Sequence, residues 1–263
     1  MPEGDTVWRT ARRLDILVGQ TLTASDFRIP SLATADLAGR AVLESASRGK
    51  HLLLRLEDQM TLHTHLKMEG RWDVQPLGTT WHRPEHEARV VLRTATHEAI
   101  GFSVLVDLVA TPAEHSLVGH LGPDLLGTDW DPGEAERRLR SLPHVPIGQA
   151  LLDQRNLAGI GNVYRAELCF LAGVDPHTPV AEVTNLPRIV TLAHRLLDHH
   201  RDKHSRVTTG DKRPGRRTWV YGRKGPCLRC GTRIATGELG PAGQERALWW
   251  CPSCQPPRGP TTS

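Results

Sequence analysis

The chain has 263 residues, enough for two domains, and its 38% hydrophobic content is sufficient to form a core in each. No run approaches the ~20 consecutive apolar residues of a membrane-spanning helix, and no charged-then-apolar leader is present. The formal charge of +4 is small. Because the sequence contains neither a membrane-spanning run nor such a leader, we exclude membrane and secreted proteins and expect an intracellular protein.

The first residues are Met-Pro-Glu-Gly-Asp-Thr. After removal of the initiator methionine, Pro2 would carry a free secondary amine, and an α-amine titrates near pH ~8. Such an amine can form a Schiff base with a carbonyl or sugar carbon, and Glu3 could exchange a proton at the same centre. Alternatively, proline is merely a permissive second residue. Asp5 or Thr6 is predicted to cap a helix over 6–18, whose positive end would lie beside Pro2 and Glu3.

From residue 21 to about residue 110, short β-rich runs separated by turns predict an antiparallel sandwich or barrel. The expected strands are 41–45, 51–56, 60–64, 71–74, 89–93 and 99–108. Lys50 would begin the second of these strands, after a turn over 47–49.

Two features of the strand region have alternative explanations. His63 and His65 would share one strand face and could ligate a metal, but no third ligand is nearby. Met68 falls at a predicted hairpin tip over 66–70. It is either a buried gap-filler or an apolar wedge for a base stack.

Glycine, proline and aspartate then mark a linker, and helices are predicted over 131–142, 147–154, 163–173 and 186–203. In segment 152–162, two glycines precede a helix that begins near Asn162. The turn is either an anion site at a helix N-terminus or a plain helix connection, and the pattern fits both.

A basic segment follows the last helix. Between Arg201 and Arg229, ten Lys or Arg residues stand against two Asp residues. A concentrated basic segment on a near-neutral body is typical of a polyanion-binding protein, although a solvated surface run has the same composition.

Four of the five cysteines form two Cys-x-x-Cys pairs separated by twenty residues. This spacing predicts a zinc ribbon with one structural Zn²⁺ held by Cys227, Cys230, Cys251 and Cys254. Redox pairs are the alternative, but the βαβ pattern that accompanies them is absent. Cys169 lies in an apolar run and is predicted to be a core residue.

Together these motifs resemble the bacterial formamidopyrimidine-DNA glycosylase and endonuclease VIII family, over essentially the whole chain. The matching segments are Pro2-Glu3-Gly4, Arg48-Gly49-Lys50, 65–70, 152–162, 220–225 and the four cysteines. The resemblance implies an α+β multidomain protein. An antiparallel β-sandwich with an N-terminal helix (1–115) and a linker (116–130) would precede a helix-two-turn-helix domain (131–212), a zinc ribbon (213–255) and a flexible tail (256–263).

The resemblance also implies the activity: a bifunctional DNA glycosylase and abasic-site lyase that cleaves the strand by β,δ-elimination. Pro2 would attack C1′, Glu3 would assist base loss and ring opening, Lys50 would transfer a proton during β-elimination, and Arg246 would act near δ-elimination. The implied DNA-binding residues are Lys50, His65, Lys67, Met68, Asn162, Glu167 and Arg246, with Met68 as the wedge that fills the space left by the flipped base.

The partner would be DNA with damaged bases or abasic sites, bound by a monomer in the cytoplasm at the nucleoid. The bias toward arginine over lysine is in keeping with a GC-rich, actinobacterial-type genome.

Three departures from the family pattern bear on the substrate. Asp5 and Thr6 replace a usual Pro and Glu, the Arg-Phe part of the wedge is absent from 102–108, and 208–217 is too short for a lesion-capping loop. The last two favour the endonuclease VIII branch and oxidised pyrimidines. The alternatives are a glycosylase for 8-oxoguanine and formamidopyrimidines, and a non-catalytic damaged-DNA-binding protein.

Overall fold

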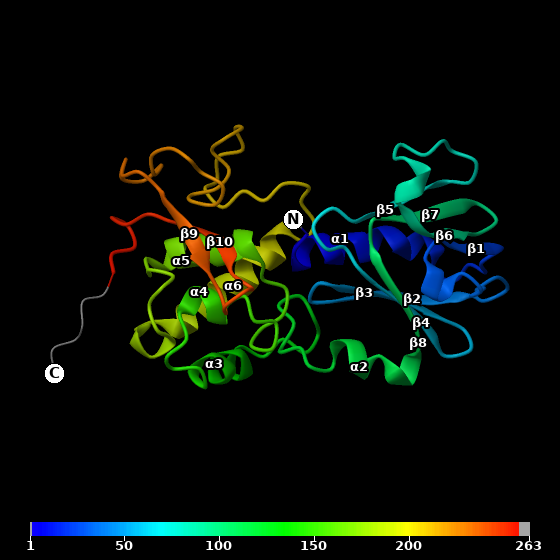
Figure 1. Ribbon diagram of the computed structural model, residues 1–263, viewed down its shortest axis with the longest axis horizontal. Helices are drawn as coiled ribbons and strands as arrows, with labels where there is room; N and C mark the ends of the chain where they lie inside the picture. The colour runs from blue at the N-terminus through cyan, green and yellow to red at the C-terminus, as the bar shows by residue number, and fades with distance from the viewer. Residues whose placement is uncertain (1, 258–263) are drawn as a thin grey trace. The chain divides into compact units, whose positions relative to one another are not determined.

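The computed structural model describes residues 2–257, and the chain divides into two compact units, Met1–His120 and Leu121–Ser263 (Figure 1). Residues 258–263 of the predicted tail lie outside the described residues. None of the described helices combines the length and the apolar character that crossing a lipid bilayer requires.

The first unit confirms the predicted antiparallel sandwich. One sheet has the order β1-β6-β7-β5 and the other β2-β3-β4-β8. The strands are β1 (Ala24–Phe27), β2 (Val42–Arg48), β3 (His51–Leu56), β4 (Met60–His65), β5 (Arg71–Pro76), β6 (Ala88–Arg93), β7 (His97–Phe102) and β8 (Leu105–Ala110).

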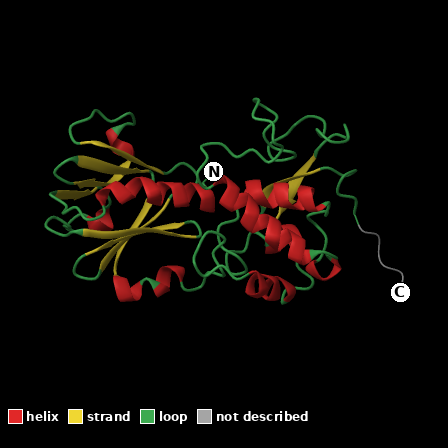
Figure 2. Cartoon of the chain, turned by 180° about the vertical axis from the view of Figure 1, so that it is seen from behind, coloured by secondary structure: helices red, strands yellow, loops and turns green. Residues whose placement is uncertain are grey.

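Helix α1 (Gly4–Leu14) runs along the space between the two sheets in both views (Figures 1 and 2). Its apolar face, Val7, Ala11 and Leu14, is buried in the same core as Leu52 and Leu54 of β3. Because side chains alternate along a strand, His51 and Arg55 lie on the face of that sheet that is turned away from this core.

Two expectations for this unit were wrong, and one strand was missed. The N-cap of α1 is Glu3, not Asp5 or Thr6, and the helix begins at Gly4. The strand predicted over 99–108 is two strands in different sheets, because Ser103 has a φ of 51° that interrupts the extended chain. Strand β1 was not predicted, since its sequence ASDF carries no alternation and its extended form depends on pairing with β6.

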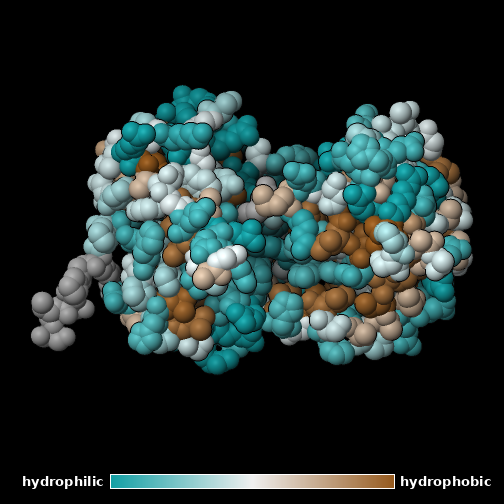
Figure 3. All heavy atoms as spheres, viewed as in Figure 1, coloured by the Kyte–Doolittle hydropathy of each residue, from teal (hydrophilic) through white to brown (hydrophobic). Residues whose placement is uncertain are grey.

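The short elements of this unit are η1 (Asp15–Leu17), η2 (Pro30–Leu32), η3 (Glu85–Glu87), η4 (Thr111–Ala113) and α2 (His115–Val118). In the space-filling view, apolar side chains shown in brown gather over part of the face that this unit presents (Figure 3). Its exposed large apolar residues include Leu43, Met68 and Leu105.

The second unit is helical and ends in a β-hairpin. Its elements are α3 (Pro132–Arg140), α4 (Ile147–Ala150), α5 (Asn162–Ala172), η5 (Val180–Glu182), α6 (Leu186–His200), β9 (Ala235–Leu239) and β10 (Arg246–Trp250). The four predicted helices are present, although the one expected over 147–154 is a single turn. The Asp131 carboxylate caps α3 by accepting hydrogen bonds from the amides of Gly133 and Glu134. Pro132 is the first residue of the helix, a position that needs no amide hydrogen.

Two cores stabilise this unit. The larger one joins α3, α4, α5 and α6, and includes the fully buried Cys169, as predicted. Burial raises the pKa of the Cys169 thiol to about 12, so this residue is not a nucleophile. The smaller core packs Ala166 and Phe170 of α5 against Val220, Ile234 and two of the paired cysteines.

Candidate active site

Pro2 and Glu3 lie directly ahead of α1. The main-chain carbonyl of Glu3 accepts hydrogen bonds from the amides of Thr6 (2.9 Å) and Val7 (3.1 Å), which starts the helix. The Glu3 side chain is fully buried and Pro2 is half-buried. Both residues therefore lie at the positive end of the helix dipole, where negative charge is stabilised.

Asp5 is also fully buried, in the first turn of α1, and its carboxylate lies 3.6 Å from the Arg9 guanidinium. A second buried carboxylate thus lies in the first turn of the helix, two residues after Glu3.

Helix α1 and strand β2 run in opposite directions. Just after η1, the Gly19 amide donates to the Val42 carbonyl at the start of β2 (2.8 Å). Further along β2, the Ser45 hydroxyl donates to the Ala11 carbonyl (3.0 Å). Moving forward along β2 therefore moves back along the helix, toward Pro2.

This alignment brings Lys50 to the level of Pro2. From Ser45 to Arg48 the strand advances roughly 10 Å, at about 3.3 Å per residue, before the chain turns at Gly49 and Lys50. From Ala11 back to Gly4, its first residue, the helix covers roughly 10 Å, at about 1.5 Å per residue, and Pro2 lies just beyond that end. The hairpin that carries Lys50 thus ends beside the start of α1.

The Lys50 hairpin is tight. Arg48 of β2 pairs with His51 of β3, which leaves Gly49 and Lys50 as a two-residue turn. Gly49 has a φ of 57°, which is the first position of a type II′ turn and one that favours glycine. Lys50 stands at the start of β3, as the sequence predicted.

The predicted loop 66–70 follows β4 at the same end of the sheet, because His65 pairs with His51. The Lys67 amide donates to His65 Nδ1 (2.9 Å), so the proton of the neutral His65 ring is on Nε2. Lys67 and Met68 are exposed, and Met68 has 64% of its surface accessible. Met68 is therefore not a core gap-filler, and it projects from the end of the sheet that holds Lys50.

The imidazoles at this end are kept neutral. Burial is the main cause that lowers the pKa of His51, to about 3, with further lowering by His63 and His65. Burial likewise lowers the pKa of His65 to about 4, and the Lys67 and Lys50 ammonium groups add to the effect. At neutral pH, His65 is thus a neutral hydrogen-bond donor beside two cations.

In the second unit, segment 152–162 forms two turns held by the Gln154 side chain. Its amide nitrogen donates to the carbonyls of Leu152 (2.7 Å) and Ile160 (3.0 Å), and its amide oxygen accepts from the Gly159 amide (3.0 Å). The φ of Gly159 is 111°, which only glycine adopts readily. The chain then enters α5 at Asn162, whose side chain makes no hydrogen bond to any residue in 2–257.

One turn further along α5, the Arg165 guanidinium holds the β9–β10 hairpin. It is fully buried and donates to the carbonyls of Leu239 (3.4 Å), Arg246 (3.3 Å) and Ala247 (2.5 Å). Arg246 is the first residue of β10 and is exposed. The positions of Asn162 and Arg246 are therefore linked by a buried side chain.

Glu167, half a turn beyond Arg165, holds a third segment. Its fully buried carboxylate accepts from the main-chain amides of Trp219 (2.8 Å), Val220 (2.9 Å) and Tyr221 (2.9 Å), and from the Thr208 hydroxyl. Glu167 thus contacts the protein's own backbone and fixes both ends of the loop between Thr208 and Tyr221.

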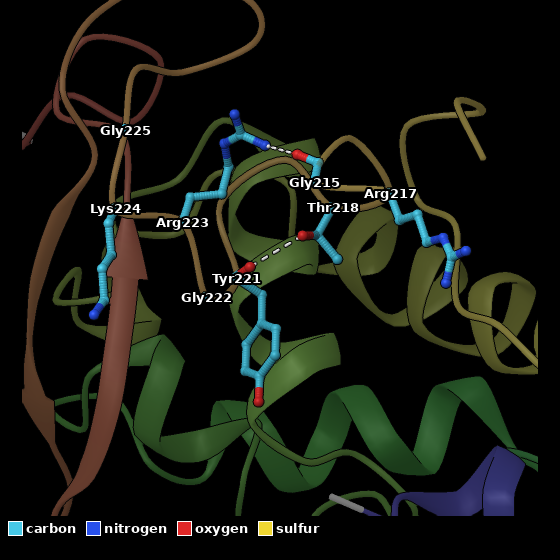
Figure 4. A pocket seen from close by; sticks show the side chains of 8 residues that line it. All are labelled: Gly215, Arg217, Thr218, Tyr221, Gly222, Arg223, Lys224 and Gly225. Atoms are coloured by element: carbon cyan, nitrogen blue, oxygen red, sulfur yellow. Dashed lines mark hydrogen bonds between the residues drawn. The ribbon is translucent and has the colours of Figure 1, made fainter. Parts of the chain in front are cut away.

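That loop carries much of the basic segment. Asp211 binds Arg213 and Arg216 within it, and these hydrogen bonds lower the pKa of the Asp211 carboxyl. A pocket of about 320 Å³ adjoins the loop (Figure 4), where Arg223 donates to the Gly215 carbonyl (2.6 Å) and Thr218 to the Tyr221 carbonyl (3.0 Å). The pocket is lined by Gly215, Arg217, Thr218, Tyr221, Gly222, Arg223, Lys224 and Gly225.

The four paired cysteines come together. Their sulfur atoms lie within 4.8 Å of one another, with Cys227 and Cys254 4.0 Å apart and Cys230 and Cys251 3.5 Å apart. Thiolates that hold a tetrahedral ion at a metal–sulfur distance of about 2.3 Å lie about 3.8 Å from one another, and the two measured separations fall on either side of this value. Main-chain amides of Arg229 and Cys254 also point at the sulfurs, as in metal knuckles. The cluster can hold one metal ion.

The predicted residues thus fall into two groups, one in each unit. Pro2, Glu3, Lys50, His65, Lys67 and Met68 belong to the first unit, and Asn162, Glu167, Arg246 and the cysteines to the second. Sequence reasoning did not identify Arg165, His51 or Asp107. Of these three residues, only Arg165 had a signal in the sequence, because it is an arginine within an apolar helical run.

Comparison with known proteins gives two domain matches. The formamidopyrimidine-DNA glycosylase N-terminal domain matches residues 1–104, and the formamidopyrimidine-DNA glycosylase H2TH domain matches residues 121–199.

Full-length relatives match as well. The chain is 52% identical to "Probable endonuclease 8 2" of Streptomyces coelicolor, over 97% of this chain and 94% of that protein. It is 48% identical to "DNA-(apurinic or apyrimidinic site) lyase Nei2" of Mycolicibacterium smegmatis, over 97% and 99%. A solved complex between Lactococcus lactis Fpg and DNA with an abasic site shares the fold, with a TM-score of 0.80 at 23% identity over 96% of this chain and 99% of that chain.

Proposed function

Since the chain belongs to the formamidopyrimidine-DNA glycosylase family, we propose that it is a bifunctional DNA glycosylase and abasic-site lyase of base-excision repair. The placement of Pro2 and Glu3 at the positive end of α1, level with Lys50, is the observation that carries this proposal. The relatives named endonuclease 8 and abasic-site lyase support the same activity. We infer that oxidised pyrimidines are the preferred bases, because the chain lacks the Arg-Phe wedge and the long capping loop.

In the proposed reaction, the neutral Pro2 amine attacks C1′ of the damaged nucleotide and the base departs with its bonding electrons. Glu3 takes the proton that the Pro2 nitrogen loses on forming this bond and delivers it to the ring oxygen, and opening of the ring leaves an iminium between Pro2 and C1′. The iminium acidifies the C2′ proton, and Lys50 takes part in the proton transfer that removes it. The 3′ phosphate then leaves by β-elimination, and the 5′ phosphate by δ-elimination near Arg246.

The remaining predicted residues would bind the DNA. His65 Nε2–H, Lys67, Asn162 and Arg246 present donors or charge to phosphates. Met68 would enter the stack when the damaged nucleotide is flipped out. We assign Glu167 a positioning role, since its carboxylate is wholly engaged by the loop that it holds.

The four cysteines would hold one Zn²⁺. With four thiolates the site is closed, so the ion folds the ribbon and presents Arg246 on its hairpin, and it takes no part in the chemistry. We infer that the protein acts as a monomer in the bacterial cytoplasm at the nucleoid, because the reaction needs one copy of each group and the substrate is chromosomal DNA.

Borohydride trapping tests the reaction. Duplexes containing thymine glycol, 8-oxoguanine or an abasic site are incubated with the protein, with and without an N-terminal extension ahead of Pro2. The extension converts the amine into an amide and should abolish a covalent protein–DNA band that the native N-terminus gives. Stronger trapping on thymine glycol than on 8-oxoguanine is expected. Binding without a band on any duplex would instead indicate a non-catalytic damaged-DNA-binding protein.

A further inference from the structure

Three polar side chains form a continuous hydrogen-bonded chain across the face of sheet β2-β3-β4-β8 that is turned away from the core. Asp107 of β8 contacts His63 Nδ1 (3.0 Å), and His63 Nε2 contacts His51 Nδ1 (2.9 Å). The His51 and His63 rings are stacked, with centroids 5.1 Å apart. Half of the Asp107 side chain is exposed, whereas His63 is buried. This series of hydrogen bonds therefore runs from the solvent-exposed Asp107 to His51, the residue that follows Lys50.

The order of the donors follows from the carboxylate. An ionised Asp107 only accepts, so His63 Nδ1 carries a proton. A neutral His63 ring then accepts at Nε2, which places the His51 proton on Nδ1 and leaves a lone pair on His51 Nε2. In the protein without DNA, His51 thus offers an acceptor, not a donor, at its remaining nitrogen.

The surroundings of His51 keep its ring neutral. His65 and His120 approach it edge-on, with centroids 5.2 and 6.4 Å away. Lys67 adds positive charge, and burial with these neighbours lowers the pKa of His51 to about 3. Lys50 acts on His65 in the same way, while Asp107 and Glu114 are the anions near His63.

A DNA phosphate at this edge would favour protonation of the imidazoles, because its negative charge offsets the positive charge of Lys50 and Lys67. One proton from solvent can then bind His51 Nε2 while the Nδ1 proton of His51 passes to His63 Nε2. His51 remains neutral and now presents an N–H to the phosphate. The added positive charge rests on His63, against the Asp107 carboxylate.

We propose that His51 is a further phosphate-binding residue of this edge, and that Asp107 and His63 are the positioning residues that take up the proton accompanying DNA binding. The inference rests on the proposed function, which brings a phosphate to Lys50. A metal centre is the competing explanation for clustered imidazoles. Among residues 2–257, however, the four cysteines are the one group of three or more ligating side chains whose ligand atoms lie close enough together to hold an ion.

Calorimetric titration of the full-length, metal-loaded protein tests this directly. The probe is a duplex with a tetrahydrofuran abasic-site analogue, which has no C1′ leaving group and cannot be cleaved. Titrations at pH 7 in buffers of different ionisation enthalpy give the number of protons taken up from the slope of observed enthalpy against buffer enthalpy. A positive proton uptake is expected, together with affinity that weakens by up to about tenfold per pH unit as pH rises.

Two variants test whether the hydrogen-bonded side chains are the source of the proton uptake. Asp107→Asn can still accept from His63 Nδ1 but cannot stabilise a charged His63, so proton uptake should fall and affinity should lose most of its pH dependence. His51→Gln offers an amide N–H at every pH and should bind with little proton uptake. Asp26→Asn is the matched control, because Asp26 lies on the other sheet, is 40% exposed and pairs with one arginine. It should behave like the unchanged protein.

Three results would overturn the inference. Equal proton uptake in the unchanged protein and in Asp107→Asn would show that the hydrogen-bonded side chains Asp107, His63 and His51 take up no proton when DNA binds. More than one tightly bound zinc per molecule, with the second lost in His51→Gln, would make the imidazoles a metal site. Failure to bind the duplex at all would overturn the proposed function as well, whereas binding without proton uptake would overturn this inference alone.

Discussion

The buried carboxylate of Glu167 holds a loop of the second unit through several hydrogen bonds at once. Three main-chain amides and one hydroxyl converge on its two oxygens, and hydrogen bonds to a charged acceptor are stronger than neutral ones. Their loss leaves buried amides without an acceptor, which carries a further free-energy penalty.

Glu167→Gln should therefore lower the free energy of unfolding of the second unit by about 2–4 kcal/mol, because one oxygen is replaced by a donor that faces other donors. Urea unfolding followed by tryptophan fluorescence measures this, since Trp219 lies in the affected loop. Glu238→Gln on exposed β9 is the control and should change stability little. Equal stability of the two variants would show that the loop does not depend on the carboxylate charge.

The depressed histidine pKa values predict a loss of stability in acid. The pKa of His51 is about 3 in the folded protein and near 6.5 in the unfolded chain, so above pH ~6.5 the ring is neutral in both states. Below that pH the unfolded chain gains a proton that the folded ring does not. Stability of the first unit should therefore fall by about 1–2 kcal/mol between pH 7 and pH 5.

Thermal unfolding across this pH range checks the prediction, with His51→Gln as the comparison. The variant has no titrating ring at this position and should show a shallower decline. A decline of the same slope in both proteins would assign the acid sensitivity to other groups.

At the scale of elements, α5 organises the second unit. Asn162 stands at its first residue, Arg165 holds the β9–β10 hairpin, and Glu167 holds the basic loop. Three segments predicted to contact DNA are thus oriented by 11 consecutive residues. A displacement of this helix would move all of them together.

Arg165→Lys should weaken binding to the tetrahydrofuran duplex by roughly 10-fold, because a compact ammonium group cannot span three separate carbonyls as the planar guanidinium does, and Arg246 loses its fixed position. The dependence of affinity on salt should fall by about one phosphate contact. A double-mutant cycle with Arg246→Ala measures the coupling. Strict additivity of the two changes, with zinc content unaltered, would contradict a positioning role for Arg165.

At the scale of the whole molecule, the two units have separate cores, and the metal cluster belongs to the second one. Chelation of the metal should therefore unfold the ribbon and lower the thermal transition of the second unit while that of the first is unchanged. Differential scanning calorimetry with and without a chelator tests this, and readdition of Zn²⁺ should restore the original trace. A single transition that shifts as a whole would mean that the units unfold cooperatively.

Local signals explain what could be predicted from the sequence. The Cys-x-x-Cys pairs, the Gly49 turn and the glycines before Asn162 each specify their geometry within a few residues, so the cysteine cluster and both turns could be predicted directly, and the strand spacing predicted the antiparallel sandwich. The break at Ser103 and strand β1 could not be predicted, because both depend on pairing with distant strands. The contacts of Arg165 span 74 to 82 residues of sequence, and no local pattern indicates them.

The hairpin that carries Arg246 lies between the two cysteine pairs, so the same short stretch holds a proposed DNA-binding residue and joins the two halves of a thiolate cluster. Thiolates are targets of the peroxides that damage DNA bases. Oxidation of Cys230 or Cys251 would release the hairpin and with it the Arg246 side chain that the proposed strand cleavage requires. Under the proposed function, the protein would be most vulnerable in the conditions that create its substrates, and its activity in a stressed cell would depend on how well a bound metal ion shields these sulfurs.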